Sequence, residues 1–148
     1  VQLDTVIHRV YEQFSRDFEK QRIQPTLALP ASMPPVVGDE TAFEQVFTSV
    51  VANAMEAMPQ GGSVTISASF PLKDATLVVA VRDTGVGISA AQQAKLFTAF
   101  QTTKPKGMGL GLALVRRIVR RFGGDVRIES AAGVGTTVLL TFAMPVPA

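Results

Sequence analysis

The chain has 148 residues, of which 47% are hydrophobic and 18% charged, so its length and composition are those of one globular domain and not of a disordered protein. It has no cysteine, which excludes a disulfide framework and a cysteine-ligated metal, and its single histidine argues against a histidine metal site. The net charge of +2 is small, and no apolar run approaches the ~20 residues that cross a bilayer.

The first part of the chain predicts a helix, a strand and a loop. Apolar residues recur at steps of three and four over residues 1–18, which is typical of a helix with one buried face. Asp4 is expected in its first turn, where a carboxylate is favoured. Residues 23–29 alternate in polarity, as a short strand does, and the proline-rich residues 31–38 predict a loop.

A second helix and two strands are predicted next. Asp39 has the side chain of an N-cap, and the apolar stripe that follows it continues to Met58 and stops before Pro59. Residues 64–70 alternate with period two and predict a strand. Residues 77–81 are continuously apolar, which is typical of a central strand buried on both faces.

The following segment predicts a short helix at residues 89–97 and a polar, mobile connection at 101–108. Residues 110–122 then show the pattern of a long helix that two glycines end, with Leu114 among the residues expected to face inward.

Two closing strands are predicted at residues 125–130 and 136–142. The hairpins imply antiparallel strand pairs, and helices are interspersed between them. The order therefore indicates an α+β fold, a two-layer sandwich in which three longer helices cover one face of a mixed sheet of about five strands.

The strand at 77–81 leads into a carboxylate and two glycines, in the run Asp83-Thr84-Gly85-Val86-Gly87. Glycine permits positive φ and lets the backbone approach a flat ligand closely. Asp83 is placed to accept a hydrogen bond from an exocyclic amine, such as that of adenine. An ordinary Asp-Gly turn is the alternative interpretation.

Three glycines, Gly107, Gly109 and Gly111, stand around Leu110 directly before the helix predicted at 110–122. Glycines free backbone N–H groups to turn inward, and a helix N-terminus offers unpaired donors at the positive end of its dipole, so this stretch favours phosphate. Its spacing is neither the Walker pattern nor the dinucleotide fingerprint, and a flexible connection is the alternative.

Three single polar residues complete the candidate set. Asn53 lies mid-helix among small and apolar residues, where its amide oxygen could ligate Mg²⁺ beside nucleotide phosphates or simply be bonded in the core. Lys104 could reach a terminal phosphate or be one solvated lysine of many. The Thr136 hydroxyl could support Asp83 through water, although threonine is also a good strand residue.

Four arginines gather near the end of the last predicted helix: Arg116, Arg117, Arg120 and Arg121. Such a cluster could contact nucleic acid or a membrane surface. Aromatic residues do not interleave with it as a stacking site requires. We therefore interpret it as a solvated helix face and expect no nucleic acid partner and no membrane insertion.

Taken in order, these motifs resemble one family, the catalytic ATP-binding domains of bacterial sensor histidine kinases in the GHKL superfamily, which have the Bergerat fold. The resemblance rests on segments similar to the N, G1, F and G2 boxes: Asn53-Ala54, Asp83 to Gly87, Phe97 to Phe100 and Gly107 to Gly111. It covers nearly the whole chain, so residues 1–148 are expected to be a single such domain. The sequence around Glu56-Ala57-Met58 is similar to that of nitrogen-regulation and oxygen-sensing kinases.

The resemblance implies a role for each candidate residue in binding ATP and Mg²⁺. Asp83 would bind the adenine amine, with Gly85, Gly87 and Thr136 beside it, and Asn53 would ligate Mg²⁺. Lys104 and the backbone around Gly107, Gly109, Leu110 and Gly111 would hold the phosphates. Residues 101–108 would form a mobile lid that orders over ATP.

The resemblance also implies partners. The γ-phosphoryl group would pass to a His on a separate dimerisation domain and then to a response-regulator receiver domain. The isolated domain is expected to be a monomer, the full-length kinase a homodimer, and the location cytoplasmic, with the possibility of a membrane-bound parent.

The sequence departs from the family pattern at one position and lacks the phosphoacceptor. Ser49 stands where the family commonly has Asn, or Glu in the ATPase relatives, and serine cannot act as that base. Glu44 is too far along the helix to replace it, and His8 does not match the phosphoacceptor segment. Ser49 favours one alternative, a degenerate nucleotide-binding signalling module. An anti-sigma-type protein serine kinase, which would usually carry an acidic base near position 49, is a second alternative, and the missing Glu argues most strongly against the third, a GHKL ATPase.

Overall fold

The computed structural model describes residues 1–70, 75–87, 108–131 and 133–145, with the backbone alone at 108–111 and 131. The short helix predicted at 89–97 lies outside these ranges. The described elements, in chain order, are α1 (Leu3–Gln21), β1 (Ile23–Ala28), α2 (Glu40–Glu56), β2 (Gly62–Ser69), β3 (Thr76–Asp83), α4 (Met108–Arg121), β4 (Asp125–Ala131) and β5 (Gly135–Ala143).

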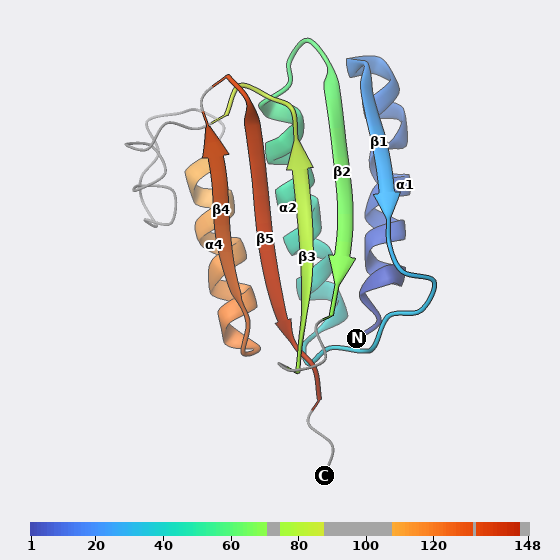
Figure 1. The fold of residues 1–148 in the computed structure, drawn as a ribbon, viewed down its shortest axis with the longest axis vertical. Helices are drawn as coiled ribbons and strands as arrows, with labels where there is room; N and C mark the ends of the chain where they lie inside the picture. The colour runs from blue at the N-terminus through green and yellow to red at the C-terminus, as the bar shows by residue number, and fades with distance from the viewer. Residues whose placement is uncertain (71–74, 88–107, 132, 146–148) are drawn as a thin grey trace.

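The strands form one five-stranded sheet in the order β1-β2-β3-β5-β4. β1 runs parallel to β2, and the other three pairs are antiparallel. The three described helices, α1, α2 and α4, lie on the same face of the sheet, behind it in Figure 1. The predicted two-layer sandwich with a mixed sheet and three covering helices is confirmed.

The first helix begins two residues later and ends three residues later than the pattern predicted. Its apolar stripe is buried as expected, and Asp4 lies in its first turn. The helix continues past residue 18 to Gln21 and ends at Arg22, whose φ of 60° is left-handed. His8 is exposed.

The central helix α2 begins at the predicted cap. The Asp39 carboxylate accepts a 2.8 Å hydrogen bond from the backbone N–H of Ala42, which satisfies one of the donors that a helix leaves unpaired at its start. The helix then packs between two other described helices, with α1 on one side and α4 on the other.

Removing this cap should lower stability modestly. We expect Asp39→Ala to reduce the free energy of unfolding by about 1 kcal/mol, because the Ala42 N–H loses its acceptor. Urea denaturation measures the change. Asp39→Ser keeps an acceptor and is the matched control, so equal losses in both variants would mean that the cap bond contributes nothing.

Aromatic rings join α2 to α4 and to the sheet. Phe43 of α2 is fully buried, and its ring meets Phe122 and Phe142 edge-on at centroid distances of 5.5 and 5.0 Å. Phe47, one turn later, stacks against Phe142 at 5.9 Å. This contact fixes α2 against β5, a strand that lies far from it in sequence.

Two predictions about burial are wrong. β3 was predicted to be buried on both faces, but its residues alternate, with Leu77 and Val79 buried and Val78 and Ala80 half-buried, because helices cover only one face of the sheet. Leu114 was predicted to face inward and is 36% exposed. The buried stripe of α4 includes Leu112, Val115 and Val119.

The arginines of α4 lie at the surface and are partly paired. Arg120 and Arg116 contact Asp125 of β4 at 2.9 and 3.4 Å, and the Arg120 hydrogen bond is the main cause that lowers the pKa of the Asp125 carboxyl. Within the described ranges, no helix is both long and apolar enough to cross a membrane.

Candidate functional site

A narrow cavity lies where the second half of α2 meets the ends of the central strands and the start of α4. Its lining residues are Val50, Asn53, Ala54, Ala57, Val81, Asp83, Leu112, Thr136 and Val138. In Figure 1 the end of α2, the tip of β3 and the start of α4 all lie towards the upper end of the sheet. The fold thus brings the predicted residues Asn53, Asp83 and Thr136 together among apolar walls.

The Asp83 carboxylate is buried at the tip of β3, only 6% exposed. Its Oδ1 accepts two backbone hydrogen bonds, from Gly85 at 2.8 Å and from Thr136 at 3.2 Å. Burial raises the pKa of Asp83, and the two N–H donors offset part of that rise. No described residue donates to Oδ2, so one carboxylate oxygen is held in place and the other can accept from a ligand.

Asn53 carries a buried amide nitrogen, Nδ2, that has no hydrogen-bond partner. Leaving such a group unpaired costs about 1–3 kcal/mol, which a ligand in the cavity can recover. Because the nitrogen and oxygen of an amide exchange places by a half-turn, the same position can present an oxygen, which is a ligand that Mg²⁺ accepts. The side-chain amide of Asn53 therefore fits the predicted metal-binding role, because it can present its oxygen as a ligand.

The helix that carries Asn53 offers no carboxylate to the cavity. Ser49, one turn before it, is half-buried. Glu44 lies within 3.6 Å of Arg9 of α1, which holds its side chain at the α1–α2 contact. Asp83 of β3 is the only carboxylate among the described residues that line the cavity.

The two glycines of the turn after β3 serve different purposes. Gly87 has a φ of 74°, the left-handed conformation expected of it. Gly85 instead lies against the end of α2, where a Cβ would stand 2.5 Å from the carbonyl oxygen of Ala57. Only the first of these reasons could be recognised in the sequence.

This turn is clamped from two sides by backbone hydrogen bonds. The Val86 N–H donates to the Ala57 carbonyl at 3.0 Å, and the Val86 carbonyl accepts from Gly133 in the β4–β5 hairpin at 2.6 Å. The Thr84 hydroxyl accepts from the Ser63 N–H at 3.0 Å. These bonds fix Asp83 relative to the helix that carries Asn53.

Of the residues predicted to bind phosphate, the structure describes only those at the start of α4. α4 begins at Met108, two residues earlier than predicted, so Gly109, Leu110 and Gly111 belong to its first turn. The N–H groups of a first helical turn have no partner within the helix. Lys104 and Gly107, the residues predicted to accompany them, lie outside the described residues, as do Phe97 to Phe100.

Thr136 differs in one respect from its predicted role. Its backbone N–H, and not its hydroxyl, bonds to Asp83. The hydroxyl lies 2.8 Å from the hydroxyl of Ser130 on β4. The sequence drew attention to the residue, but only the pairing of β5 with β3 reveals which atom meets the carboxylate.

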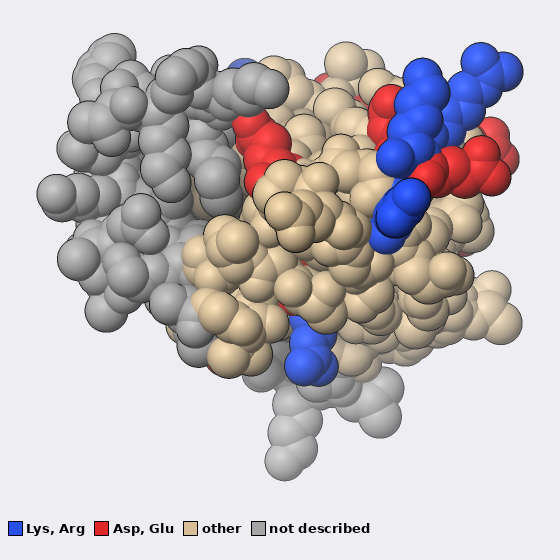
Figure 2. Space-filling model, turned by 90° about the horizontal axis from the view of Figure 1, so that it is seen from above, with Lys and Arg blue, Asp and Glu red and all other residues tan. Residues whose placement is uncertain are grey.

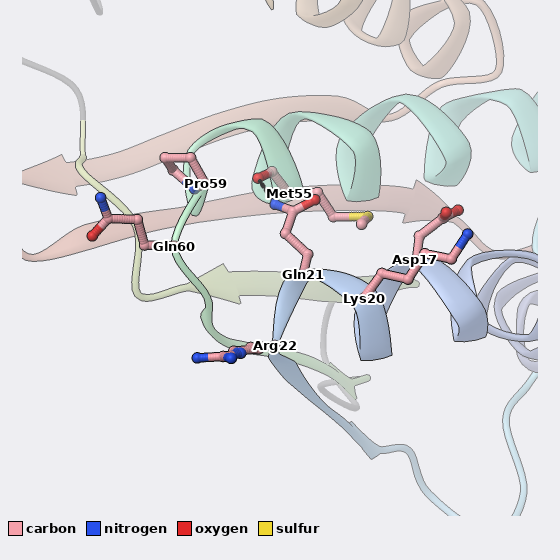
Figure 3. Close-up of a pocket in the computed structure, with 7 residues that line it drawn as sticks. All are labelled: Asp17, Lys20, Gln21, Arg22, Met55, Pro59 and Gln60. Atoms are coloured by element: carbon pink, nitrogen blue, oxygen red, sulfur yellow. Dashed lines mark hydrogen bonds between the residues drawn. The ribbon is translucent and has the colours of Figure 1, made fainter.

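A second, more open depression lies beside α1 and holds none of the predicted residues (Figure 3). Asp17, Lys20, Gln21 and Arg22 line it from the end of α1, and Met55, Pro59 and Gln60 from the end of α2. The Gln21 amide donates to the Met55 and Met58 carbonyls at 2.6 and 2.9 Å. Its described contacts are therefore structural, since they cap the helix that carries Asn53.

The charges at this end of the molecule are unevenly distributed. Seen from above in Figure 2, most of the blue and red side chains cluster at one edge, on the side where Figure 1 places α1, whereas the middle of this end is mostly uncharged. Of the two hollows, the cavity with Asp83 is a better candidate site than the depression beside α1, because it combines a buried carboxylate, an unpaired amide and apolar walls.

The sequence matches a known family and its members. Residues 38–146 match the model of the family described as histidine kinase-, DNA gyrase B- and HSP90-like ATPase. The chain is 34% identical to the sensor histidine kinase ZraS of Escherichia coli (strain K12) over 140 residues, 95% of this chain and 30% of ZraS. It is 42% identical to sporulation kinase D of Bacillus subtilis (strain 168) over 106 residues, 72% of this chain and 20% of that kinase. The chain thus spans less than a third of either relative.

Solved structures agree with this assignment. The nucleotide-free catalytic domain of histidine kinase ThkA superposes with a TM-score of 0.87 at 28% identity, covering 97% of this chain and 93% of that one. Full-length ShkA in complex with AMPPNP superposes at 0.83 and 28%, covering 99% and 31%. ThkA in complex with the response regulator TrrA superposes at 0.82 and 25%, covering 98% and 41%.

Proposed function

Because the chain belongs to the family of histidine kinase-, DNA gyrase B- and HSP90-like ATPases, we propose that it binds Mg-ATP in the cavity around Asp83 and donates the γ-phosphoryl group to a histidine. It corresponds to the catalytic ATPase part of protein-histidine kinases, as its named relatives indicate. The histidine would belong to a separate dimerisation domain of the same two-component sensor kinase.

One observation supports the proposal that the cavity binds the adenine base. Asp83 is held in place by two hydrogen bonds to Oδ1, and no described residue donates to its Oδ2. An exocyclic amine donates to such an oxygen, and the raised pKa of Asp83 reflects a dry environment in which that bond is strong. Val81, Leu112 and Val138 supply apolar walls for the flat ring. AMPPNP, an analogue of ATP, is the nucleotide in the related ShkA complex, which supports an adenine nucleotide here.

The phosphates and the metal would lie between α2 and α4. Asn53 would contribute its amide oxygen to Mg²⁺, and the first-turn N–H groups at Gly109, Leu110 and Gly111 would face the phosphates. Lys104 would add a positive charge. The bound Mg²⁺ would neutralise charge on the phosphate oxygens during transfer.

Phosphoryl transfer depends on positioning and charge neutralisation more than on covalent help, so this domain needs no nucleophile of its own. His8 is exposed on α1 and is not among the described residues that line the cavity. The phosphate would pass from the dimerisation domain to a response-regulator receiver domain. A complex between the related kinase ThkA and its response regulator supports that partner class, and the use of ATP favours a cytoplasmic location.

The isolated chain should bind ATP without labelling itself. We expect no label from [γ-³²P]ATP to stay on the chain after denaturation, and label to appear on the dimerisation domain of the same kinase when that domain is added. Asn53→Ala removes the proposed metal ligand together with an unpaired buried amide, so it should abolish transfer while leaving stability intact.

Label that stays on the isolated chain would contradict the assignment of the nucleophile to another domain. ATP binding without any transfer to the dimerisation domain would favour the second candidate, a nucleotide-binding signalling module that has lost catalysis. Ser49 is the observation that keeps this second candidate open.

A further inference from the structure

A hydroxyl group on β4 lies directly behind the cavity. Ser130 is paired with Thr136 across the β4–β5 ladder. Its Oγ donates to the Gly135 carbonyl at 3.0 Å and lies 2.8 Å from Thr136 Oγ1. Ser130 is not among the residues that line the cavity, so its influence on a ligand passes through Thr136.

The bond to Gly135 determines the direction of the bond between the two hydroxyls. A carbonyl oxygen only accepts, so the single proton of the Ser130 hydroxyl points at Gly135. Either hydroxyl of this pair could donate by distance alone, and with the Ser130 proton on Gly135 we assign the donor as Thr136 and the acceptor as Ser130 Oγ. Thr136 Oγ1 keeps only lone pairs and can only accept from a ligand in the cavity.

Asp83, like the Thr136 hydroxyl, presents only hydrogen-bond acceptors to the cavity. Its Oδ1 already accepts from Gly85 and Thr136, and its Oδ2 is a second acceptor. A base with an exocyclic amine places a donor at this end of the cavity, whereas a base with a carbonyl there places an acceptor against acceptors. Such unmatched polar groups weaken binding strongly in a buried site.

We propose that Ser130 is a positioning residue for base selection. Ser130 accepts the proton of the Thr136 hydroxyl, so Thr136 and Asp83 present only hydrogen-bond acceptors to the nucleotide base. The cavity therefore favours adenine over a base that carries a carbonyl in place of the exocyclic amine. This inference rests on the proposed function, because it requires a nucleotide base in the cavity.

The experiment compares the affinities of ATP and of inosine triphosphate, in which a carbonyl replaces the amine, by calorimetry on this chain. We expect the wild type to prefer ATP by at least about tenfold, and Ser130→Ala to reduce that preference about fivefold, because the freed Thr136 hydroxyl can turn and donate to the carbonyl. Ser130→Thr keeps the hydroxyl and should retain the preference. Ser67→Ala, a half-buried serine of β2 outside the cavity, is the matched control.

The ratio of two affinities separates positioning from stability, since a general loss of folding lowers both. A wild type that prefers ATP, together with an unchanged ratio in Ser130→Ala, would overturn this inference alone. So would an equal loss in the Ala and Thr variants, because packing and not the hydroxyl would then matter. A wild type with no preference would overturn both this inference and the assignment of Asp83 to the adenine amine.

Discussion

Asp83→Asn is expected to lower the affinity for ATP by about 10- to 100-fold while the fold is retained. The amide keeps an oxygen that can accept from Gly85 and Thr136, so the turn after β3 stays in place. It replaces Oδ2 by an NH₂ group, which meets the exocyclic amine donor to donor. Isothermal titration calorimetry with Mg-ATP measures the loss.

A nucleotide without the amine provides the control for this prediction. Purine riboside triphosphate makes no amine contact with Asp83, so its weaker binding should change little between wild type and Asp83→Asn. An unchanged ATP affinity, or an equal loss for both nucleotides, would show that Asp83 does not bind the amine.

The same variant has a predictable effect of pH on stability. Because burial raises the pKa of Asp83 in the folded state, the carboxyl is charged less readily there than in the unfolded chain. The free energy of unfolding therefore falls as pH rises from the ordinary value of 3.8 through the raised folded pKa, and stays lower above it. Asp83→Asn removes this loss, so its stability relative to wild type should be greater at pH 7 than at pH 4 in urea denaturation. The opposite trend would mean that the charged carboxylate stabilises the fold.

Gly135→Ala is expected to lower the free energy of unfolding by about 3 kcal/mol or more. Gly135 has a φ of 137°, and a Cβ added there overlaps the carbonyl oxygen of Asp83. The variant therefore combines backbone strain with a clash inside the β3–β5 pair. Since Asp83 itself must shift, ATP affinity should fall as well. Denaturation and calorimetry on the same sample measure both effects.

Gly133→Ala separates the two causes. Gly133 also has a positive φ, 80°, but a Cβ there meets no described atom within 4 Å. Only the backbone cost of about 1–2 kcal/mol is then expected, with ATP affinity unchanged. Equal destabilisation by the two substitutions would mean that the contact between Gly135 and Asp83 is not the cause of the loss.

Much of the architecture could be predicted from local pattern. The helical periodicity that begins near Asp39, the alternation of β2 and the glycines after the strand that ends in Asp83 all depend on residues close in sequence. Helix and strand periods and the need for positive φ at Gly87 are properties of short segments. These segments were therefore predicted well, apart from shifts of two or three residues at ends of α1, α2, β2, β3 and α4.

The errors arose where a second segment decides the outcome. Whether Val78 is buried depends on what covers the far face of the sheet, and whether Leu112 or Leu114 faces inward depends on where α4 docks. The reason for Gly85 is the nearby end of α2, and the contact that ends α2 comes from Gln21 of α1. None of these partners is adjacent in the sequence.

The sequence by itself determined the chemistry of the cavity, because Asn53, Asp83 and Thr136 bring their donors and acceptors wherever the chain places them. Only the tertiary structure decided how those atoms are used. The antiparallel pairing of β3 with β5 turns the Thr136 N–H towards Asp83, and the pairing of β5 with β4 turns its hydroxyl towards Ser130. The physical reason is that hydrogen bonds are directional and reach about 3 Å, so their partners are set by strand register and not by residue type.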